Sequence, residues 1–215
     1  MLRIKRVHSA ELREEVYALR YRAYRRQGAI QELPGERFCD AYDAQPNHAL
    51  WALSDHEKLV GSIRTTWYDP AEPWTIPEMD CYAADVARVV PVGARMLSGN
   101  RFVTDPDRPD RDSSYAMFLL RFYMVVAKSR AEHALAAVRV NHLPFYRRVL
   151  KLERVSEGRV YPGLTSVMYL TACDFQQNID HVYSSTPLLR PRGYERLFMD
   201  ENYRDVWEIG LPVEV

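Results

Sequence analysis

Two carboxylates and an arginine lie close together in the first third of the sequence. Asp40 and Asp43 occur in the segment F-C-D-A-Y-D, ahead of a predicted hairpin, and Arg64 lies between apolar neighbours on the second strand of that hairpin. Carboxylates can bind an ammonium group, and an arginine can bind a carboxylate with two hydrogen bonds. These residue types suit an amino-acid ligand. They also suit a set of salt bridges that fastens a loop to a sheet.

A helix is expected just before this segment. Ser9 is a good N-cap, the helix runs to about Gln27, and Gly28 ends it. Its apolar residues recur every three or four positions, which indicates one buried face. Arg20 and Tyr24 lie in this helix one turn apart. The helix therefore brings an arginine and an aromatic ring towards the loop that carries the two carboxylates.

The rest of the chain alternates strands and helices around one long loop. Residues 28–47 hold prolines and glycines and no period, so we expect a loop there, and a loop of this length in a compact domain usually has a function. Helices are expected at 79–90, from Ser113 or Ser114 to 132, and at 143–150. Strands are expected at 2–7, 49–53, 59–68, 95–103, 136–140 and 165–173. This order predicts a mixed α/β fold.

Length and composition narrow the possible functions. The chain has 215 residues, which suits one domain, predicted at 1–175, and a C-terminal extension at 176–215 with a linker-like start and a helix at 194–209. Lys+Arg and Asp+Glu both number 29, which argues against a nucleic-acid partner. The three cysteines are far apart and support neither a disulfide framework nor a metal site. The sequence shows no signal peptide and no membrane span, so we expect a cytoplasmic protein.

Four short motifs resemble a known family. They are Arg20 with Tyr24, the segment D-A-Y-D, the S-I-R that ends at Arg64, and the R-F of Arg101 and Phe102. In this order the motifs resemble the acyl-homoserine-lactone synthases and the N-acyl amino acid synthases. A later segment, N-H-L-P-F-Y-R-R-V-L, is more similar to the N-acyl amino acid synthases. The resemblance covers about residues 16–174.

The resemblance implies an acetyltransferase-like (GNAT) fold, with a mixed, mostly antiparallel sheet flanked by helices. It implies an enzyme that joins a fatty acyl group, delivered as a thioester, to the amine of an amino acid or a related acceptor. One departure concerns Ser98, which stands where the family has a glutamate. Two alternatives therefore remain: an acyl-homoserine-lactone synthase that uses S-adenosylmethionine, and a non-catalytic module that binds an acyl chain or a carrier protein.

The resemblance also assigns roles to residues. The predicted catalytic residues are Asp40, Asp43, Arg64 and Arg101. The predicted substrate-binding residues are Arg20, Tyr24, Phe38, Ser98, Phe102, His142 and Tyr146. Aminolysis of a thioester needs a neutral amine, a proton acceptor and donors for the oxyanion. We expect Asp43 and Arg64 to order the loop and Asp40 to face the acceptor.

His142 and Tyr146 each have two interpretations. Tyr146 lies where acetyltransferases often keep a tyrosine that protonates the departing thiolate, but a buried tyrosine bonded to backbone is the alternative. His142 titrates in the range of a general base, although a histidine beside a strand end is commonly structural.

The acyl donor is expected to be a phosphopantetheine thioester, with no permanently bound cofactor. Ordinary acetyltransferases bind coenzyme A with a glycine-rich loop before a long helix, and the corresponding segment here, R-P-D-R-D-S-S, has no glycine. This favours acyl carrier protein over coenzyme A. Carrier proteins are acidic, so docking needs a basic surface. The basic clusters available are Arg22, Arg25 and Arg26, or Arg147, Arg148 and Lys151. The aromatic face of the long helix is a candidate acyl tunnel or simply core.

Overall fold

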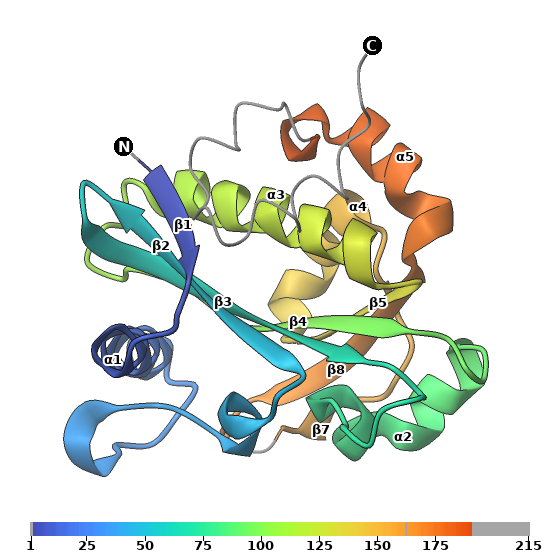
Figure 1. The fold of residues 1–215 in the computed structure, drawn as a ribbon, viewed down its shortest axis with the longest axis horizontal. Helices are drawn as coiled ribbons and strands as arrows, with labels where there is room; N and C mark the ends of the chain where they lie inside the picture. Colours follow the sequence, from blue (N-terminus) through green and yellow to red (C-terminus); the bar gives the residue numbers. More distant parts are fainter. Residues whose placement is uncertain (1, 162, 191–215) are drawn as a thin grey trace.

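The computed structural model describes residues 2–161 and 163–190, apart from the side chains of residues 125, 128–130 and 188. Its centre is an eight-stranded sheet in the order β1-β2-β3-β4-β5-β8-β6, with β7 paired to β8 (Figure 1). The strands are β1 (Leu2–Arg6), β2 (His48–Asp55), β3 (Lys58–Tyr68), β4 (Met96–Thr104), β5 (His133–Val138), β6 (Glu153–Arg154), β7 (Arg159–Val160) and β8 (Val167–Asp174). Only β4 and β5 pair in parallel.

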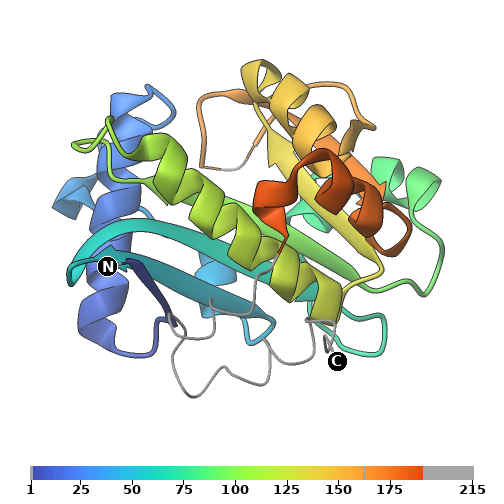
Figure 2. The same ribbon diagram turned by 90° about the horizontal axis from the view of Figure 1, so that it is seen from above.

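Helices cover both faces of this sheet, with α3, α4 and α5 on one face and α1 and α2 on the other (Figures 1 and 2). The helices are α1 (Ala10–Arg26), α2 (Pro77–Val89), α3 (Asp112–Arg130), α4 (Leu143–Leu150) and α5 (Phe175–Ser185), with short 3-10 turns at Pro34–Glu36, Ala41–Ala44, Val140–His142 and Pro187–Leu189. The predicted mixed α/β class with a mostly antiparallel sheet is confirmed. No helix within the two described ranges is long and apolar enough to cross a bilayer.

The first helix forms as its sequence predicts. The Ser9 side chain accepts a hydrogen bond from the Leu12 amide at 3.2 Å, and Gly28 adopts a φ of 64° just beyond the C-cap. The buried face of α1 packs against β3 and β4. Arg20 lies on that buried face, and its side chain is fully buried. The helix therefore presents a guanidinium to the interior of the protein.

The predicted hairpin brings Arg64 opposite Leu50. The register of β2 and β3 pairs these two residues, and the tight turn between the strands uses His56 and Glu57, both with positive φ. The turn is shorter than the five-residue S-D-H-E-K connection predicted, because pairing extends to Asp55 on β2. The side chain of Arg64 is fully buried on β3.

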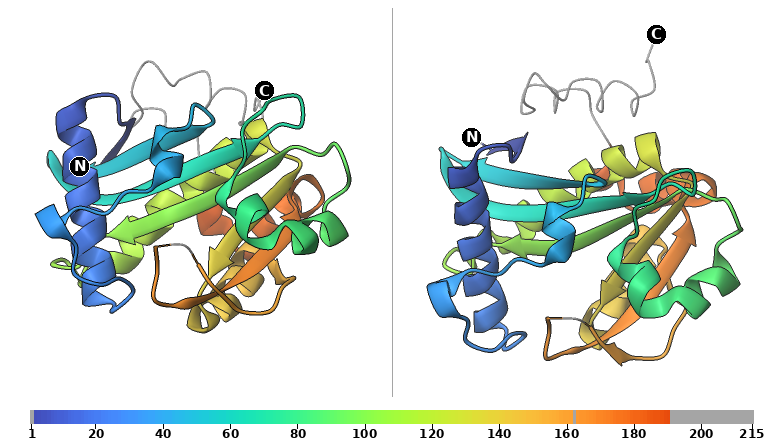
Figure 3. Two further views of the ribbon diagram at one scale, coloured as in Figure 1. Left: turned by 90° about the horizontal axis from the view of Figure 1, so that it is seen from below. Right: turned by 60° about the horizontal axis from the view of Figure 1, so that its bottom comes forward.

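The fourth strand bends where the chemistry is expected. Its pairing with β3 shifts between Ser62 and Arg64, and Arg101 adopts a φ of 52°. Such a backbone conformation is unusual for a residue with a side chain and is typical of functional sites. Residues 96–98 of β4 pair with residues 133–135 of β5, and the two strands diverge beyond that point (Figure 3).

The bounds of helix α3 and of strand β5 differ from the sequence prediction. Helix α3 begins at Asp112, so Ser113 and Ser114 lie inside its first turn and neither is the N-cap. The N-cap position is held by Arg111, whose side chain makes no capping hydrogen bond. The carboxylate of Asp112 instead accepts a hydrogen bond from Thr104. The strand expected at 136–140 lies at His133–Val138, because the chain turns into a 3-10 helix at Val140.

The segment after residue 174 contains a helix that the sequence prediction missed. The Asp174 side chain caps α5 by accepting a hydrogen bond from the Gln177 amide at 2.9 Å. Phe175, Ile179 and Val182 of α5 are buried in the same core as α3. The helix predicted at 194–209 lies outside the described residues.

Candidate functional site

A pair of buried charges joins α1 to the loop that precedes the hairpin. Arg20 donates from Nη1 to both carboxylate oxygens of Asp43, at 3.0 Å each. Nη1 of Arg64 lies 3.0 Å from Oδ1 of the same carboxylate. Asp43 is therefore held between one guanidinium from α1 and one from β3.

Asp40 occupies an equivalent position between two strands. Arg64 donates to both of its oxygens, at 2.5 and 3.1 Å, and Arg101 donates to Oδ2 from Nε at 2.9 Å and from Nη2 at 2.7 Å. Asp40 thus links β3 to β4 at the point where β4 bends. All five predicted charges, Arg20, Asp40, Asp43, Arg64 and Arg101, form one connected cluster.

A short capping turn holds the two carboxylates in place. Asp40 is the N-cap of the 3-10 turn Ala41–Ala44, and its side chain accepts from the Tyr42 amide at 3.0 Å. Asp43 completes a capping box, because its carboxylate accepts from the Asp40 amide at 3.0 Å. The spacing D-x-x-D therefore fixes both the turn and the separation of the two charges.

Burial and ion pairing act in opposite directions on these carboxyl groups. Burial alone raises the pKa of Asp40, but the guanidiniums of Arg64 and Arg101 outweigh burial and hold the pKa well below its usual range. The same balance, with Arg20 and Arg64 as the partners, lowers the pKa of Asp43. Both groups are ionised at neutral pH and act as fixed negative charges.

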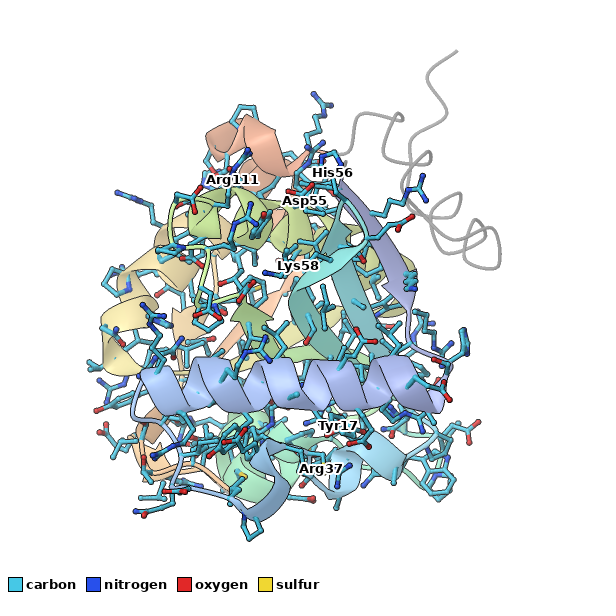
Figure 4. The ribbon with its side chains drawn as sticks, turned by 90° about the vertical axis from the view of Figure 1, so that its left-hand side faces the viewer. Tyr17, Arg37, Asp55, His56, Lys58 and Arg111 are labelled. Carbon is cyan, nitrogen blue, oxygen red and sulfur yellow. The ribbon has the colours of Figure 1, made fainter. Side chains whose placement is uncertain are left out.

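The outer part of this loop is fastened to α1. Arg37 forms a salt bridge with Glu14 at 2.8 Å and stacks on the Tyr17 ring, as Figure 4 shows for the labelled pair. The Phe38 amide donates to the Tyr17 carbonyl at 3.1 Å. The loop from 28 to 47 is therefore fastened to α1 at Arg37 and Phe38, just before the two carboxylates.

Aromatic rings surround Arg101. Its guanidinium lies 4.6 Å from the centre of the Phe38 ring and 5.9 Å from those of Tyr24 and Tyr161. Gly163, at a φ of 77°, approaches the Phe38 ring closely enough that an added Cβ would lie 3.6 Å away. The rings and Asp40 together keep Arg101 in one orientation.

A cleft of about 260 Å³ opens where β4 and β5 diverge. Of the predicted site residues, the cleft wall includes Tyr24, Arg101, Phe102, His142 and Tyr146. Those behind or beside it are Arg20, Phe38, Asp40, Asp43, Arg64 and Ser98. The charge cluster therefore reaches the cleft through Arg101.

Two titratable residues of the cleft wall, His142 and Tyr146, lie around the start of α4. Burial, with a contribution from Arg139, lowers the pKa of His142, which favours the neutral imidazole. Burial raises the pKa of Tyr146 to about 12, so its hydroxyl keeps its proton at neutral pH. A proton donor and a neutral base are thus both present on this side of the cleft.

Two polar residues of the cleft wall were missed by the sequence analysis. Asn100 accepts from Arg64 at 2.6 Å and donates to the hydroxyls of Thr66 and Ser98, at 3.0 and 3.2 Å. Its position directly before Arg101 was the only signal in the sequence. Asn100, which lies in the cleft wall, therefore connects the charge cluster to Ser98.

Glu78 is the second missed residue. It is the second residue of α2 and is fully buried. The Tyr161 hydroxyl donates to Oε1 at 3.4 Å, whereas Oε2 has no hydrogen-bond partner in the part of the chain that the structure describes. Burial raises the pKa of Glu78, and the hydroxyl of Ser98 opposes that shift. An acid in the first turn of a helix gave no sequence signal for burial, because such acids are usually exposed.

No cluster of three or more potential metal ligands occurs among the described residues. The cleft wall instead combines two guanidiniums, Arg101 and Arg139, and two carboxyl groups, Glu78 and Asp112, with aromatic rings, uncharged polar groups and apolar side chains. A sheet whose parallel strands β4 and β5 divide around such a cleft is the arrangement expected of the acetyltransferase-like fold class. Comparison with known proteins identifies the family. The N-acyl amino acid synthase FeeM family matches residues 15–174, and the chain belongs to that family.

Solved structures agree with this assignment of the fold. FeeM, an N-acyl amino acid synthase from uncultured soil microbes, superposes with a TM-score of 0.67 at 14% identity, over 86% of this chain and 97% of FeeM. BjaI, a CoA-dependent acyl-homoserine lactone synthase solved with MTA, gives 0.58 at 14% identity, over 93% of each chain. An acyl-CoA N-acyltransferase from Pseudomonas aeruginosa gives 0.53 at 13% identity, over 80% of this chain and 99% of that one. No protein of curated function matches the sequence.

These comparisons confirm the resemblance found in the sequence, the predicted fold and the prediction that the chain is an N-acyltransferase.

Proposed function

We propose that this N-acyltransferase joins a fatty acyl group, carried as a thioester on acyl carrier protein, to the amine of an amino acid. The observation that carries the proposal is the buried guanidinium of Arg101 in the wall of the cleft between β4 and β5. A guanidinium in a partly dry cleft binds a carboxylate strongly. An amino acid held there by its carboxylate presents its amine to the same cleft.

The acceptor side of the site is pre-organised by the charge cluster. Arg101 uses Nε and Nη2 to hold Asp40, and within the described residues its Nη1 makes no hydrogen bond. This leaves one edge of the guanidinium for a ligand. Asp40, Asp43, Arg64 and Arg20 then act through Arg101 by holding it in position.

The thioester carbonyl is proposed to lie against the open edge of β4. Beyond Ser98 that edge has no strand partner on the side facing β5, so its backbone amides are available to stabilise an oxyanion. Tyr146, which keeps its proton at neutral pH, is suited to protonate the departing thiolate. His142, also in the cleft wall, is a second candidate for proton transfer.

The acyl chain is proposed to enter a narrow apolar extension of the cleft. The extension shares Gly99, Phe102 and Tyr146 with the main cleft and continues between α3 and β4 to Leu120 and Tyr123. Its volume is about 10 Å³, so a long chain enters only when these side chains move. Each methylene buried there contributes about 0.8 kcal/mol.

The docking surface for the carrier protein is proposed at α4. A groove of about 710 Å³ runs along this helix, with Arg147, Arg148, Lys151 and Arg154 in its wall. Tyr146 of the same helix lies in the wall of the reaction cleft. An acidic protein seated on this groove is therefore close enough to deliver its prosthetic arm. This donor agrees with the cytoplasmic location expected from the sequence.

The start of α3 supports a carrier protein over coenzyme A. Backbone amides at a helix N-terminus often bind phosphate. Here Asp112 occupies that terminus and lies in the wall of the cleft. Its negative charge disfavours a pyrophosphate at this position.

One experiment tests the proposal directly. The purified chain is given a fatty acyl group on carrier protein or on coenzyme A, together with the twenty amino acids, and N-acyl products are identified by mass spectrometry. We expect N-acyl amino acids from the carrier-protein donor, and their loss in Arg101→Ala but not in the exposed control Arg3→Ala. Acyl lactones formed only with S-adenosylmethionine would instead identify an acyl-homoserine-lactone synthase. Donor binding without thiol release would contradict the proposal.

A further inference from the structure

One carboxyl group in the cleft wall has no ionic partner. Glu78 is fully buried. Among the described residues its side chain accepts a long hydrogen bond from Tyr161 and lies near the Ser98 hydroxyl, but no cation lies within salt-bridge distance of it. Its Oε2 has no partner among the described residues. Buried carboxyl groups in proteins are normally hydrogen-bonded or paired, so an orphaned oxygen calls for an explanation.

The ordinary structural roles do not account for this side chain. A glutamate in the first turn of a helix usually stabilises the helix dipole from the protein surface. Glu78 is buried instead, and the exposed Asp80 of the same turn can stabilise the dipole. The four other carboxylates buried in the described structure, Asp43, Asp85, Asp105 and the largely buried Asp40, each lie within salt-bridge distance of an arginine or lysine. Glu78 has no such cation and faces the cleft.

We propose that the Glu78 carboxylate is the base that takes the proton of the acceptor's ammonium group in the acyl transfer. The inference rests on the proposed function, since it requires an amine acceptor held by Arg101. Arg101 and Glu78 both belong to the wall of the cleft, one suited to the carboxylate of an amino acid and the other to its ammonium. The two side chains come from β4 and α2, so they can contact opposite ends of one small molecule.

The proton and electron balance of the step is simple. Glu78 accepts one proton from the ammonium, which leaves a neutral amine. The nitrogen lone pair forms the N–C bond with the thioester carbonyl, and collapse of the tetrahedral intermediate breaks the C–S bond. The second nitrogen proton is transferred to the departing sulfur, directly or through Tyr146, so the products are an amide and a thiol. Burial raises the pKa of Glu78, which brings it closer to that of the amine and makes the transfer easier.

Glu78→Gln tests this role because it keeps the shape of the side chain and removes the base. We expect the kcat for N-acylation at pH 7 to fall by about 100-fold or more, with the KM for the acyl donor unchanged. Glu72→Gln, at an exposed position near the same helix, is the matched control and should keep wild-type kcat. The probes are an acyl carrier protein charged with one fatty acyl group and the amino acid that the wild type acylates fastest.

A pH profile separates a base from a structural residue. Raising the pH above the pKa of the acceptor's own amine, about 8 or higher, supplies neutral amine from solution. The loss in Glu78→Gln should therefore shrink at high pH. Other titratable and charged groups lie around Glu78, and they are the same in the wild type and in Glu78→Gln. Those that interact with Glu78 are Arg64, Tyr161, Tyr42, Cys81, Tyr82 and Tyr123. Arg101, His142 and Tyr146 lie elsewhere on the cleft wall.

A second variant keeps the test decisive if Glu78→Gln folds poorly. The Ser98 hydroxyl is close enough to influence the Glu78 carboxyl, so Glu78→Ser combined with Ser98→Glu moves the carboxyl across the same space. We expect the exchanged protein to recover at least a tenth of wild-type kcat, while Glu78→Ser alone does not.

The outcomes distinguish this inference from the proposed function. Wild-type kcat in Glu78→Gln, or a loss of equal size at every pH, overturns the role of Glu78 and leaves N-acylation standing. A folded exchange variant as inactive as Glu78→Ser also overturns it. Absence of N-acylation by the wild type refutes the proposed function itself, and the role of Glu78 with it.

Discussion

Arg101 donates two hydrogen bonds to a single oxygen of Asp40, from Nε at 2.9 Å and from Nη2 at 2.7 Å. Arg101 also has a φ of 52°, which costs about 1 kcal/mol or more for a residue with a side chain. The contact with Asp40 offsets this strain and aims the guanidinium at the cleft. The strained backbone and the ion pair with Asp40 therefore act together to position the Arg101 side chain.

The Asp40–Arg101 contact predicts that Asp40→Asn lowers catalysis without removing a group that touches substrate. The amide cannot neutralise Arg64 and Arg101 together, so Arg101 gains freedom to move. We expect kcat/KM to fall by about 100-fold, mainly through the KM of the amino acid. Steady-state kinetics check this, with the exposed Asp110→Asn as the control. An unchanged KM for the acceptor would contradict a positioning role.

Asp43 predicts a specific dependence of stability on pH. Its pKa is lowered in the folded protein, so its contribution is fully present above the unfolded value of about 3.9 and is lost as the pH falls through the folded value. Asp43→Asn should therefore cost about 3–5 kcal/mol at pH 7, because Arg20 is left buried without its partner. The difference from wild type should shrink below about pH 4. Urea unfolding at several pH values measures it, and a difference that is constant with pH would rule out the linkage.

Local signals in the sequence were sufficient to predict much of the fold. The Ser9 cap, the period of α1 and the polar turn between the two runs that form β2 and β3 are local features, and each of these elements formed where expected. The five charges were also identified, because they belong to the short motifs that resemble those of known synthases. The resemblance to known synthases added the fold as a whole.

The missed features depend on contacts between distant segments. Glu78 follows a proline at a helix start, and nothing local shows that it turns inward to meet Ser98, twenty positions later in the chain. The positive φ of Arg101 accompanies a contact with Asp40, which lies 61 positions earlier in the chain, and no local pattern shows that contact. Helix α5 did carry a local signal, with Asp174 as cap and apolar residues at Phe175, Ile179 and Val182, but its polar composition disguised it.

The apolar extension of the cleft predicts control of acyl length by Tyr123. The Tyr123 ring lines the extension, and a Cβ added at Gly99 would lie 2.7 Å from that ring. Tyr123→Leu should open the extension and shift the preferred acyl chain upward by two or more carbons. Phe122→Leu is the matched control, because Phe122 packs on Trp51 at 4.5 Å on another part of the core. Competition between acyl donors of different length, read by mass spectrometry, measures the shift. An equal shift in both variants would show a general loosening of the core.

The groove along α4 predicts a donor-specific defect. Arg148→Glu with Lys151→Glu reverses two charges in its wall. We expect kcat/KM for acyl carrier protein to fall by about ten-fold or more, with a smaller effect at high salt and little effect on an acyl-CoA donor. The pair Arg22→Glu with Arg25→Glu tests the alternative surface on α1. A larger defect in that second pair would move the docking site to α1.

If Glu78 serves as a base, the Glu78→Gln variant should lose activity and gain stability. Its pKa is raised in the folded protein, so its contribution to stability is fully present below the unfolded value of about 4.3 and is lost as the pH rises through the folded value. Glu78→Gln has no such ionisation. We therefore expect its Tm to match that of the wild type near pH 4 and to exceed it at pH 8, by about 2–4 °C for each kcal/mol gained. Calorimetry at the two pH values measures this, with Glu72→Gln expected to follow the wild type at both. A Glu78→Gln protein less stable than the wild type at pH 8 would contradict this prediction. It would show that the surroundings stabilise the ionised carboxyl of Glu78, so that its unpartnered oxygen is not reserved for binding a substrate.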